Sequence, residues 1–303
     1  MGTFGGHALP GSFFILFAVW WTIQIFRRYY RSLQKNGAPF RASVTYPSSC
    51  LCGRLKSYEI EGCVKIFFTA VGFTLEIITA HKDGKFVHLG NAQHATMFFI
   101  FGLSGVLDLL VYHRFPLPKD IEYIAAILAL TVEGVLFSFH LHGRTEMDKQ
   151  LHYLLVFTVF ANIAALLAEM RYRRNVLAPL TRTFFFLCQG TWFWQVGWIL
   201  YPPFGGGGWD EHDHGQMMIT AMIFTWHLGI NFIFMFTVGA IIGCIYRFRS
   251  EFVNYGGYTQ LGIPLLKRNT NEHTVVNVNE DFDDSDLEFQ KPLTKVPNSQ
   301  QPG

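Results

Sequence analysis

Residues 133–152 read EGVLFSFHLHGRTEMDKQLH, and the fold prediction works outward from this stretch. It leaves one apolar segment, crosses a short charged connection and enters the next apolar segment. It holds the carboxylate Glu133 and three histidines, His140, His142 and His152. Ionisable groups within lipid-soluble segments are costly unless they face other protein or a water-filled cavity. The stretch therefore predicts two neighbouring membrane helices whose polar residues have a function.

The composition is typical of a membrane protein. Hydrophobic residues make up 50% of the 303 residues, and charged residues make up only 15%, against about 25% in a typical soluble domain. The mean hydropathy is positive at +0.23. The net charge of +2, without a basic cluster interleaved with aromatic residues, excludes nucleic acid as a partner. We predict an all-α, polytopic membrane protein whose immediate partners are membrane lipids.

Seven apolar runs have about the 20-residue length that spans a bilayer. They lie near 9–26, 60–80, 93–112, 120–140, 150–170, 182–201 and 216–246. The first run is followed directly by Arg27 and Arg28 and lacks the features of a cleavable signal peptide, so we expect it to remain as an anchor. These runs predict a seven-transmembrane-helix bundle over residues 1–249.

The distribution of basic residues predicts the orientation of this bundle. Most Lys and Arg residues fall in the connections after the first, third, fifth and seventh runs. The alternate connections hold Lys82, Lys85, Arg144 and Lys149. Lys and Arg accumulate in cytoplasmic loops. With an odd number of spans, the N-terminus is predicted to be luminal or extracellular and the C-terminus cytosolic.

Residues 250–303 have a different composition, rich in Asn, Thr, Gln, Pro and acidic residues. Such a segment cannot bury enough apolar area to fold, so it predicts a disordered acidic cytosolic tail. Tyr258-Thr259-Gln260-Leu261 has the form of a tyrosine-based sorting signal, with Tyr258 and Leu261 as its recognition residues. Sorting adaptors would then be partners, and the protein would cycle among Golgi, endosomes and plasma membrane. A passive tail is the alternative, because so short a pattern often arises by chance.

Two cysteines lie in the first cytosolic connection of the predicted topology. Cys50 and Cys52 follow a basic segment next to the membrane, a position typical of palmitoylation. Two free cytosolic thiols are the alternative interpretation.

The histidines are distributed unevenly across the predicted membrane. Ten of the twelve lie in luminal connections or in the luminal halves of helices: His7, His81, His88, His94, His140, His142, His152, His212, His214 and His227. Imidazole is a common ligand of transition metals and titrates near physiological pH. The pattern therefore suits a metal site, a pH-sensitive site or a proton-linked pathway on the luminal side.

Four of these histidines lie in different spans at similar depth. His94, His140, His152 and His227 are predicted to converge from the third, fourth, fifth and seventh spans, with Glu133 below them as a hydrogen-bonding partner or base. Zinc or copper is the predicted metal. A b-type haem between His94 or His152 and His227 is a weaker alternative. No motif with zinc-enzyme spacing is present in the sequence, and hydrogen-bonded interfacial histidines are the plainer interpretation.

Further polar residues of the spans predict a shared cavity open to the lumen, which would keep them away from lipid. Its expected lining, besides Glu133, is Glu76, His142, Gln189, Trp192 and Gln195. Helix packing accounts for the glutamines and Trp192. The alternative is an aromatic wall that holds a lipid-like or sterol-like ligand.

Several short motifs, taken in order, resemble the transmembrane protein 45 family over about residues 1–250. They are Gly6-His7-Ala8-Leu9-Pro10-Gly11, Gln93-His94-Ala95-Thr96-Met97, His140-Leu141-His142-Gly143-Arg144, Gly190-Thr191-Trp192-Phe193-Trp194-Gln195, Tyr201-Pro202-Pro203 and Trp226-His227. The resemblance implies a seven-helix membrane protein of the Golgi, endosomes or cell surface. It implies no reaction, substrate or catalytic residue.

Three classes of function follow from the sequence. One is a non-catalytic membrane protein with a role in transport, sensing or trafficking and a histidine-lined luminal cavity, which the lack of catalytic spacing favours. Another is a metal-dependent, zinc-like membrane enzyme that acts on a lipid-like substrate, with Glu133 as its base. The third is a structural or trafficking partner that binds no ligand.

The predicted orientation can be tested with epitope tags at both termini. Protease added to intact cells is expected to digest the N-terminal tag and to leave the C-terminal tag protected. The reason is that the connections rich in basic residues, such as the one between the fifth and sixth spans, are predicted to be cytosolic. Immunoblots of both tags measure the result, and permeabilised cells provide the control. The reverse pattern contradicts the predicted orientation.

The sorting signal has its own test. Tyr258→Ala is expected to raise the surface fraction of the protein, because adaptors of this type recognise the tyrosine side chain. Surface biotinylation measures that fraction, and Tyr255→Ala in the same tail is the control. An unchanged distribution identifies the tail as passive.

Overall fold

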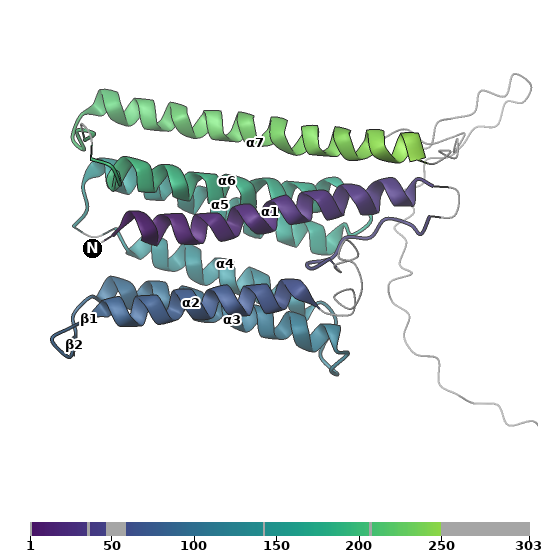
Figure 1. The fold of residues 1–303 in the computed structure, drawn as a ribbon, viewed down its shortest axis with the longest axis horizontal. Coiled ribbons are helices and arrows are strands. Elements are labelled where there is room, and N and C mark those ends of the chain that lie inside the picture. Colours follow the sequence, from purple (N-terminus) through teal and green to yellow (C-terminus); the bar gives the residue numbers. More distant parts are fainter. Residues whose placement is uncertain (1, 35–36, 47–58, 142, 206–207, 250–303) are drawn as a thin grey trace, which may run out of the picture. The chain divides into compact units, whose positions relative to one another are not determined.

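The computed structural model describes residues 2–34, 37–46, 59–141, 143–205 and 208–249. Within these ranges the chain forms seven helices and one short hairpin (Figure 1): α1 (Phe4–Ser32), α2 (Ile60–Ala80), β1 (His81–Lys82), β2 (Lys85–Phe86), α3 (Leu89–Tyr112), α4 (Ile121–Phe139), α5 (Glu146–Arg171), α6 (Leu177–Leu200) and α7 (His214–Arg249). Each predicted span overlaps one helix, so the predicted all-α, seven-helix bundle is confirmed. The predicted tail at 250–303 lies outside the described residues, as do Cys50, Cys52, His142, Tyr258 and Leu261.

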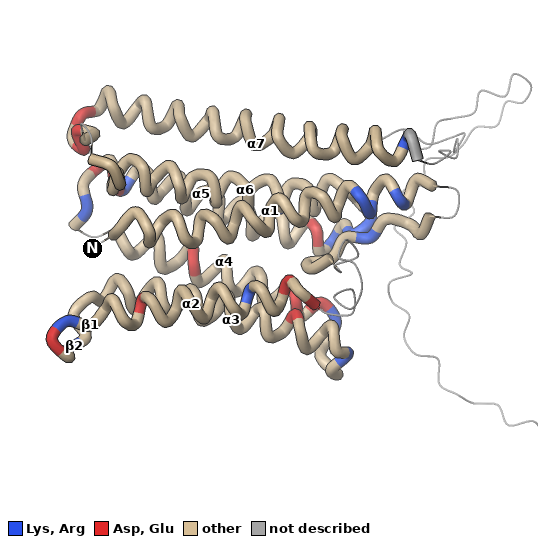
Figure 2. The backbone as a smooth tube through the Cα atoms, in the orientation of Figure 1, with Lys and Arg blue, Asp and Glu red and all other residues tan. Residues whose placement is uncertain are grey.

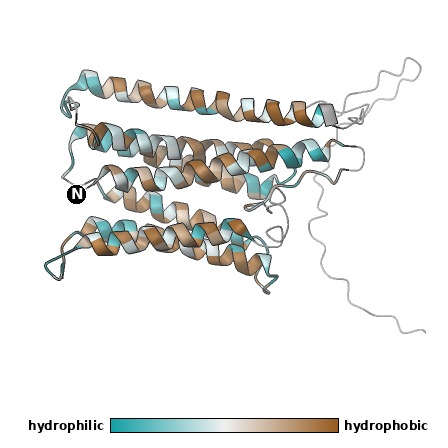
Figure 3. Ribbon diagram, viewed as in Figure 1, coloured by the Kyte–Doolittle hydropathy of each residue, from teal (hydrophilic) through white to brown (hydrophobic). Residues whose placement is uncertain are grey.

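Six of the seven described helices, α1 to α5 and α7, are long and apolar enough to cross a membrane. Apolar residues run along the helices (Figure 3), and charged residues gather mainly at helix ends and in the connections (Figure 2). Helix α6 is less apolar because it carries threonines, glutamines and tryptophans. It packs extensively against α1 and α5, so much of its polar surface is shielded from lipid. The sixth predicted span is thus an interior helix of the bundle.

Glycines allow two helix pairs to approach closely. On α1 and α6, a Cβ atom added to Gly11 would lie 2.9 Å from the Gly190 carbonyl oxygen, and one added to Gly190 would lie 2.8 Å from the backbone nitrogen of Ile15. On α2 and α3, a Cβ atom at Gly62 would lie 3.0 Å from the carbonyl oxygen of Gly105. Small residues at such crossings are the usual means by which membrane helices pack backbone to backbone. These contacts fix α1 on α6 and α2 on α3.

A tight turn joins α2 to α3. In the β1–β2 hairpin, Lys82 pairs with Lys85 across Asp83 and Gly84, whose φ angles are +53° and +72°. An Asp-Gly pair is favoured at such turns because both central residues need positive φ. The α2–α3 pair lies along one edge of the described bundle and α7 along the opposite edge (Figure 1). We call the end of the bundle where α1 begins and α2 ends the histidine end.

At the opposite end, the buried carboxylate of Glu61 links α1 to α2. It accepts hydrogen bonds from the indole nitrogens of Trp20 (2.6 Å) and Trp21 (2.9 Å) and from the backbone nitrogen of Tyr46 (2.8 Å). Lys65 of α2 also forms an ion pair at 2.5 Å with Asp108 of α3. Lys65 and Asp108 therefore hold α2 and α3 together, and Glu61 holds this pair to α1.

A second buried network joins α4, α5 and α6 at the same end. Arg182 Nε donates to Glu169 Oε2 at 2.6 Å, and the two residues are only 1% and 0% exposed. The hydroxyl of Tyr123 donates to Glu169 Oε1 at 2.9 Å, and the guanidinium of Arg182 lies 4.2 Å from the centre of the Trp21 ring. Each charge has its opposite charge on the other helix, so the ion pair depends on both partners.

Arg182→Met is expected to lower the free energy of unfolding by about 3–5 kcal/mol, because it leaves the carboxylate of Glu169 buried without a cation. The double variant Glu169→Leu/Arg182→Met is expected to recover much of that loss, since both charges are then removed. Thermal unfolding of detergent-purified protein measures the change. The exposed Arg171→Met variant is the control, and a single variant as stable as the wild type contradicts the expectation.

Candidate functional site

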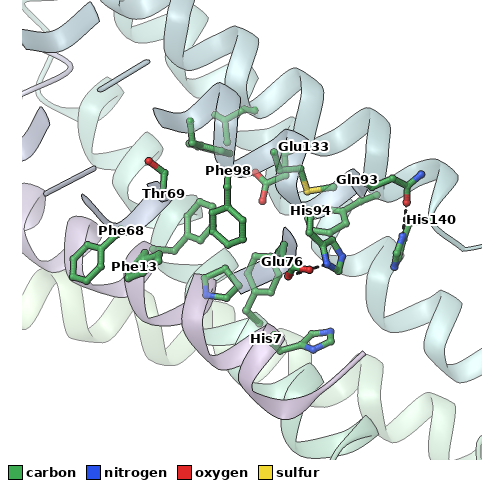
Figure 4. A pocket seen from close by; sticks show the side chains of 18 of the residues that line it. His7, Phe13, Phe68, Thr69, Glu76, Gln93, His94, Phe98, Glu133 and His140 are labelled. Atoms are coloured by element: carbon green, nitrogen blue, oxygen red, sulfur yellow. Dashed lines mark hydrogen bonds and ion pairs between the residues drawn. The ribbon is translucent and has the colours of Figure 1, made fainter. Parts of the chain in front are cut away.

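A cavity of about 1180 Å³ lies between α1, the α2–α3 pair and α4, and side chains of α5 and α6 complete its lining. Aromatic side chains line its middle, among them Phe13, Phe14, Phe68, Phe98 and Phe101. Polar side chains surround it at the histidine end, where Figure 4 shows His7, Glu76, Gln93, His94 and His140. The cavity is therefore amphipathic, with an apolar body and a polar end.

Helical spacing places the lining residues of each helix on one face. On α3, Gln93, His94, Met97, Phe101 and Ser104 follow one another at intervals of one, three or four residues. On α4, Ala126, Leu130, Glu133 and Phe137 recur every three or four residues and line the same cavity. Residues spaced in this way share a helix face. Each of these two helices thus presents one continuous face to the cavity.

The first helix contributes a histidine through its N-terminal cap. Thr3 caps α1 by accepting a hydrogen bond from the backbone nitrogen of Gly6. One turn later, the Nδ1 atom of His7 lies 3.0 Å from the carbonyl oxygen of Thr3, so Nδ1 carries the proton. The His7 ring faces the His152 ring at 5.9 Å between centroids. The start of α1 therefore completes the histidine end of the cavity.

A chain of hydrogen bonds joins α3, α4 and α5 at this end. His140 Nδ1 donates to Gln93 Oε1 at 2.5 Å, and His140 Nε2 accepts from Arg144 Nη2 at 2.6 Å. Arg144 Nη1 donates to Asp148 Oδ2 at 2.8 Å, and Asp148 Oδ1 lies 2.7 Å from His152 Nδ1. We call Gln93, His140, Arg144, Asp148 and His152 the rim network.

This network keeps His140 neutral. Its Nε2 atom accepts a hydrogen bond from a guanidinium, so only Nδ1 can carry a proton. Burial, followed by the neighbouring His94 and Arg144, lowers the pKa of His140 from its ordinary value of 6.5 to about 3. Both ring nitrogens are thus occupied, and neither is free for a metal ion.

His94 has a different partner. Its Nδ1 atom lies 3.3 Å from Glu76 Oε1 across α2 and α3, as Figure 4 shows, and its ring lies 5.0 Å from the His140 ring. The contact joins the α2–α3 pair at the histidine end. The two ring contacts, His94 with His140 and His7 with His152, therefore bring the four histidines together as two pairs.

Glu133 occupies the middle of the cavity wall and is 3% exposed. Its Oε1 atom accepts a hydrogen bond from Gln189 Nε2 at 2.9 Å, and Gln189 Oε1 accepts from Asn162 Nδ2 at 3.1 Å. Its Oε2 atom has no hydrogen-bond partner among the described residues. One carboxyl oxygen is therefore fixed by the bundle, and the other is unsatisfied.

The structure places the predicted site residues in two groups. The cavity is lined by His94, His140, His152, Glu133 and Glu76. Four predicted members do not line it, namely His227, Gln189, Trp192 and Gln195, and a fifth, His142, is outside the described residues. The His227 ring contacts Trp192 of α6 at 5.5 Å, so α6 separates it from the cavity.

Trp192 is fully buried and donates its indole N–H to the carbonyl oxygen of Leu151 at 3.0 Å. This hydrogen bond links α6 to α5, as the packing interpretation of the tryptophan expects. The described residues contain no group of three or more His, Cys, Asp or Glu side chains that could hold a metal ion. The zinc, copper and haem sites therefore remain predictions from the sequence.

Three members of the rim network, Gln93, Arg144 and Asp148, were not singled out by sequence reasoning. Arg144, Asp148 and His152 are spaced four residues apart, which indicates one helix face, and this spacing was visible in the sequence. Gln93 carries no comparable signal, because its contact with His140 joins residues 47 positions apart. His7 was counted with the luminal histidines, but only the packing of α1 brings it to the cavity.

Comparisons with known proteins agree with this architecture. Residues 119–240 match a family described as "Family of unknown function (DUF716)". The chain is 25% identical over 306 residues to transmembrane epididymal protein 1 of Rattus norvegicus, which covers 97% of both chains. It is 26% identical over 250 residues to transmembrane epididymal protein 1A of Mus musculus, covering 76% of this chain and 78% of the relative. The family match spans Glu133 and the rim residues from His140 to His152.

The neutral state of His140 predicts a pH dependence of stability. The unfolded chain binds a proton at this residue below about pH 6.5, but the folded protein does not bind it until about pH 3. Stability from His140 is therefore complete above pH 6.5 and is lost as the pH falls toward 3. Between pH 6.5 and 5 we expect the free energy of unfolding to fall less for His140→Gln than for the wild type, by about 1 kcal/mol or less because solvent screens the partly exposed ring, and the Tm of the variant should fall less in parallel.

Thermal unfolding in detergent at several pH values measures this difference. His81→Gln, at an exposed histidine of the hairpin, is the control and should follow the wild type. Parallel curves for the wild type and His140→Gln contradict the expectation.

Proposed function

We propose that this multi-pass membrane protein, which is similar to the DUF716 family and to transmembrane epididymal proteins, binds a lipid-like ligand non-catalytically in the cavity between α1, α2, α3 and α4. The ordered motifs that resemble the transmembrane protein 45 family agree with this similarity. The observation that carries the proposal is the cavity itself. Ligand pockets usually measure about 300–1,000 Å³ and combine an apolar lining with a few placed polar groups, and the cavity of about 1180 Å³ has this character.

The arrangement of polar groups supports an amphipathic ligand. The middle of the cavity offers aromatic faces, which suit an acyl chain or a ring system. Polar groups lie at the histidine end, and the membrane orientation predicted from the basic residues makes this the luminal end. A ligand with an apolar body and a polar head matches this division.

The hydrogen bonding of the rim supports a binding role over a catalytic one. A catalytic base or nucleophile needs a free position within reach of its substrate. In the rim network both nitrogens of His140 and the Oδ2 atom of Asp148 form hydrogen bonds with protein partners, and Asp148 Oδ1 lies 2.7 Å from His152 Nδ1. These side chains hold α3, α4 and α5 together around the cavity, as expected of a carrier or a sensor.

Residence in the Golgi, endosomes or plasma membrane belongs to the same proposal. It is supported by the Tyr258–Leu261 motif, which adaptors would recognise on the cytosolic side. A ligand-binding membrane protein that cycles among these compartments would meet luminal lipids in each of them.

Photo-cross-linking tests the cavity. A diazirine-bearing fatty alcohol is added to the protein in phosphatidylcholine nanodiscs, with excess unlabelled alcohol as competitor, and labelled peptides are mapped by mass spectrometry. Saturable labelling is expected around Phe13, Phe68 and Phe98, because these rings line the cavity. Ala126→Phe, which fills part of the cavity, is expected to abolish most of the saturable labelling.

Leu128→Phe on the same helix is the matched control. Leu128 is 49% exposed on the outer surface of the bundle, so this variant should label like the wild type. Labelling that is not saturable, or that both variants reduce equally, contradicts a ligand in the cavity.

A further inference from the structure

The charges that line the cavity are paired, with one exception. Lys65 pairs with Asp108, Arg144 with Asp148, Arg182 with Glu169, and Glu76 lies against His94. Glu133 has only the neutral amide of Gln189 as a partner, at Oε1. It is therefore the one carboxyl group of the described cavity lining that lacks a basic partner.

The unsatisfied oxygen of Glu133 faces an unusual environment. The residue is only 3% exposed, and its Oε2 atom has no hydrogen-bond partner among the described residues. A buried polar atom left in this state is destabilising by about 1–3 kcal/mol, more for a charged group. Figure 4 shows the side chain in the cavity wall near Phe98 and His94. Because Glu133 lines the cavity, an occupant of the cavity can supply the missing partner.

We propose that Glu133 binds the ammonium group of a basic amphiphile whose apolar body occupies the aromatic part of the cavity. This inference rests on the proposed function, because it identifies the class of the lipid-like ligand. The proposed ligand therefore carries one positive charge and one long apolar body.

The surroundings of Glu133 favour an ammonium group over a metal ion. A metal ion of the kinds common in proteins needs several oxygen, nitrogen or sulfur ligands, and no group of three such charged or imidazole side chains is present among the described residues. An ammonium group needs one carboxylate and is further stabilised by aromatic faces. Phe98, Phe101 and Phe137 line the same cavity as Glu133, so this cavity contains both kinds of group.

An ammonium group is also favoured over a hydroxyl group. A hydrogen bond between two charged partners is roughly twice as strong as one between neutral groups. The cations of the cavity lining are already paired, so an ammonium group of the ligand would be the cation that stabilises the ionised form of Glu133. Within an apolar wall, such an ion pair distinguishes a charged head group from a neutral one.

The test compares two probes of equal chain length, decylamine and decanol. Both compete with the diazirine fatty alcohol for the protein in phosphatidylcholine nanodiscs at pH 7, where a primary amine is protonated. Decylamine is expected to displace the label at about a tenfold lower concentration than decanol, as a charge-assisted hydrogen bond implies. Glu133→Gln should remove this preference and leave displacement by decanol unchanged.

Two further variants make the comparison specific. Glu133→Asp keeps the carboxylate and is expected to retain the preference for the amine. Glu122→Gln removes a carboxylate of the same helix outside the cavity and should behave like the wild type. If Glu133→Gln does not fold, the wild-type difference between amine and alcohol still tests the inference.

The outcomes separate this inference from the proposed function. Saturable labelling with equal displacement by both probes, or a preference that survives in Glu133→Gln, overturns the ammonium site and leaves a lipid-binding cavity. Labelling that neither probe displaces overturns the cavity proposal and the ammonium site together.

Discussion

The structure depends on the need of buried polar groups for partners inside the helical bundle. A charge in such a place is stable only when another helix supplies its complement. Arg182 and Glu169 satisfy this condition between α6 and α5, and Lys65 and Asp108 satisfy it between α2 and α3. Each pair fixes the rotation of two helices about their own axes. The polar residues therefore specify which helix faces meet, although apolar burial supplies most of the contacts.

The same condition explains why a cavity survives between closely packed helices. Gly11 and Gly190 bring α1 onto α6, and Gly62 and Gly105 bring α2 onto α3, so the bundle consists of two tight assemblies. Glu61 of α2 joins these assemblies through its hydrogen bonds to Trp20 and Trp21 of α1. Large aromatic side chains fill the space between them only in part. A long, mostly apolar space with polar ends is the consequence.

The two polar features of the cavity differ in character. The rim network is closed, since each of its members bonds to another member, and it gives the histidine end a fixed geometry. Glu133 is only partly hydrogen-bonded, because Gln189 donates to one of its oxygens and the other has no partner among the described residues. A rigid entrance and an unsatisfied group deeper inside are what selective binding of an amphipathic molecule requires. The four histidines thus contribute mainly to the architecture of the site, and Glu133 contributes to its chemistry.

The sequence by itself determined the class and the helices of this protein, because hydropathy and span length are local properties of the chain. Runs of about 20 apolar residues located all seven helices, and the expense of Glu133, His94, His140 and His152 in lipid identified residues that line one cavity. Only the tertiary structure decided which helices meet there. His7 joins the site and His227 does not, because α1 packs directly on the cavity and α6 stands between it and α7. That choice depends on close contacts such as Gly11 with Gly190, which join residues far apart in the chain and leave no periodic signal in it.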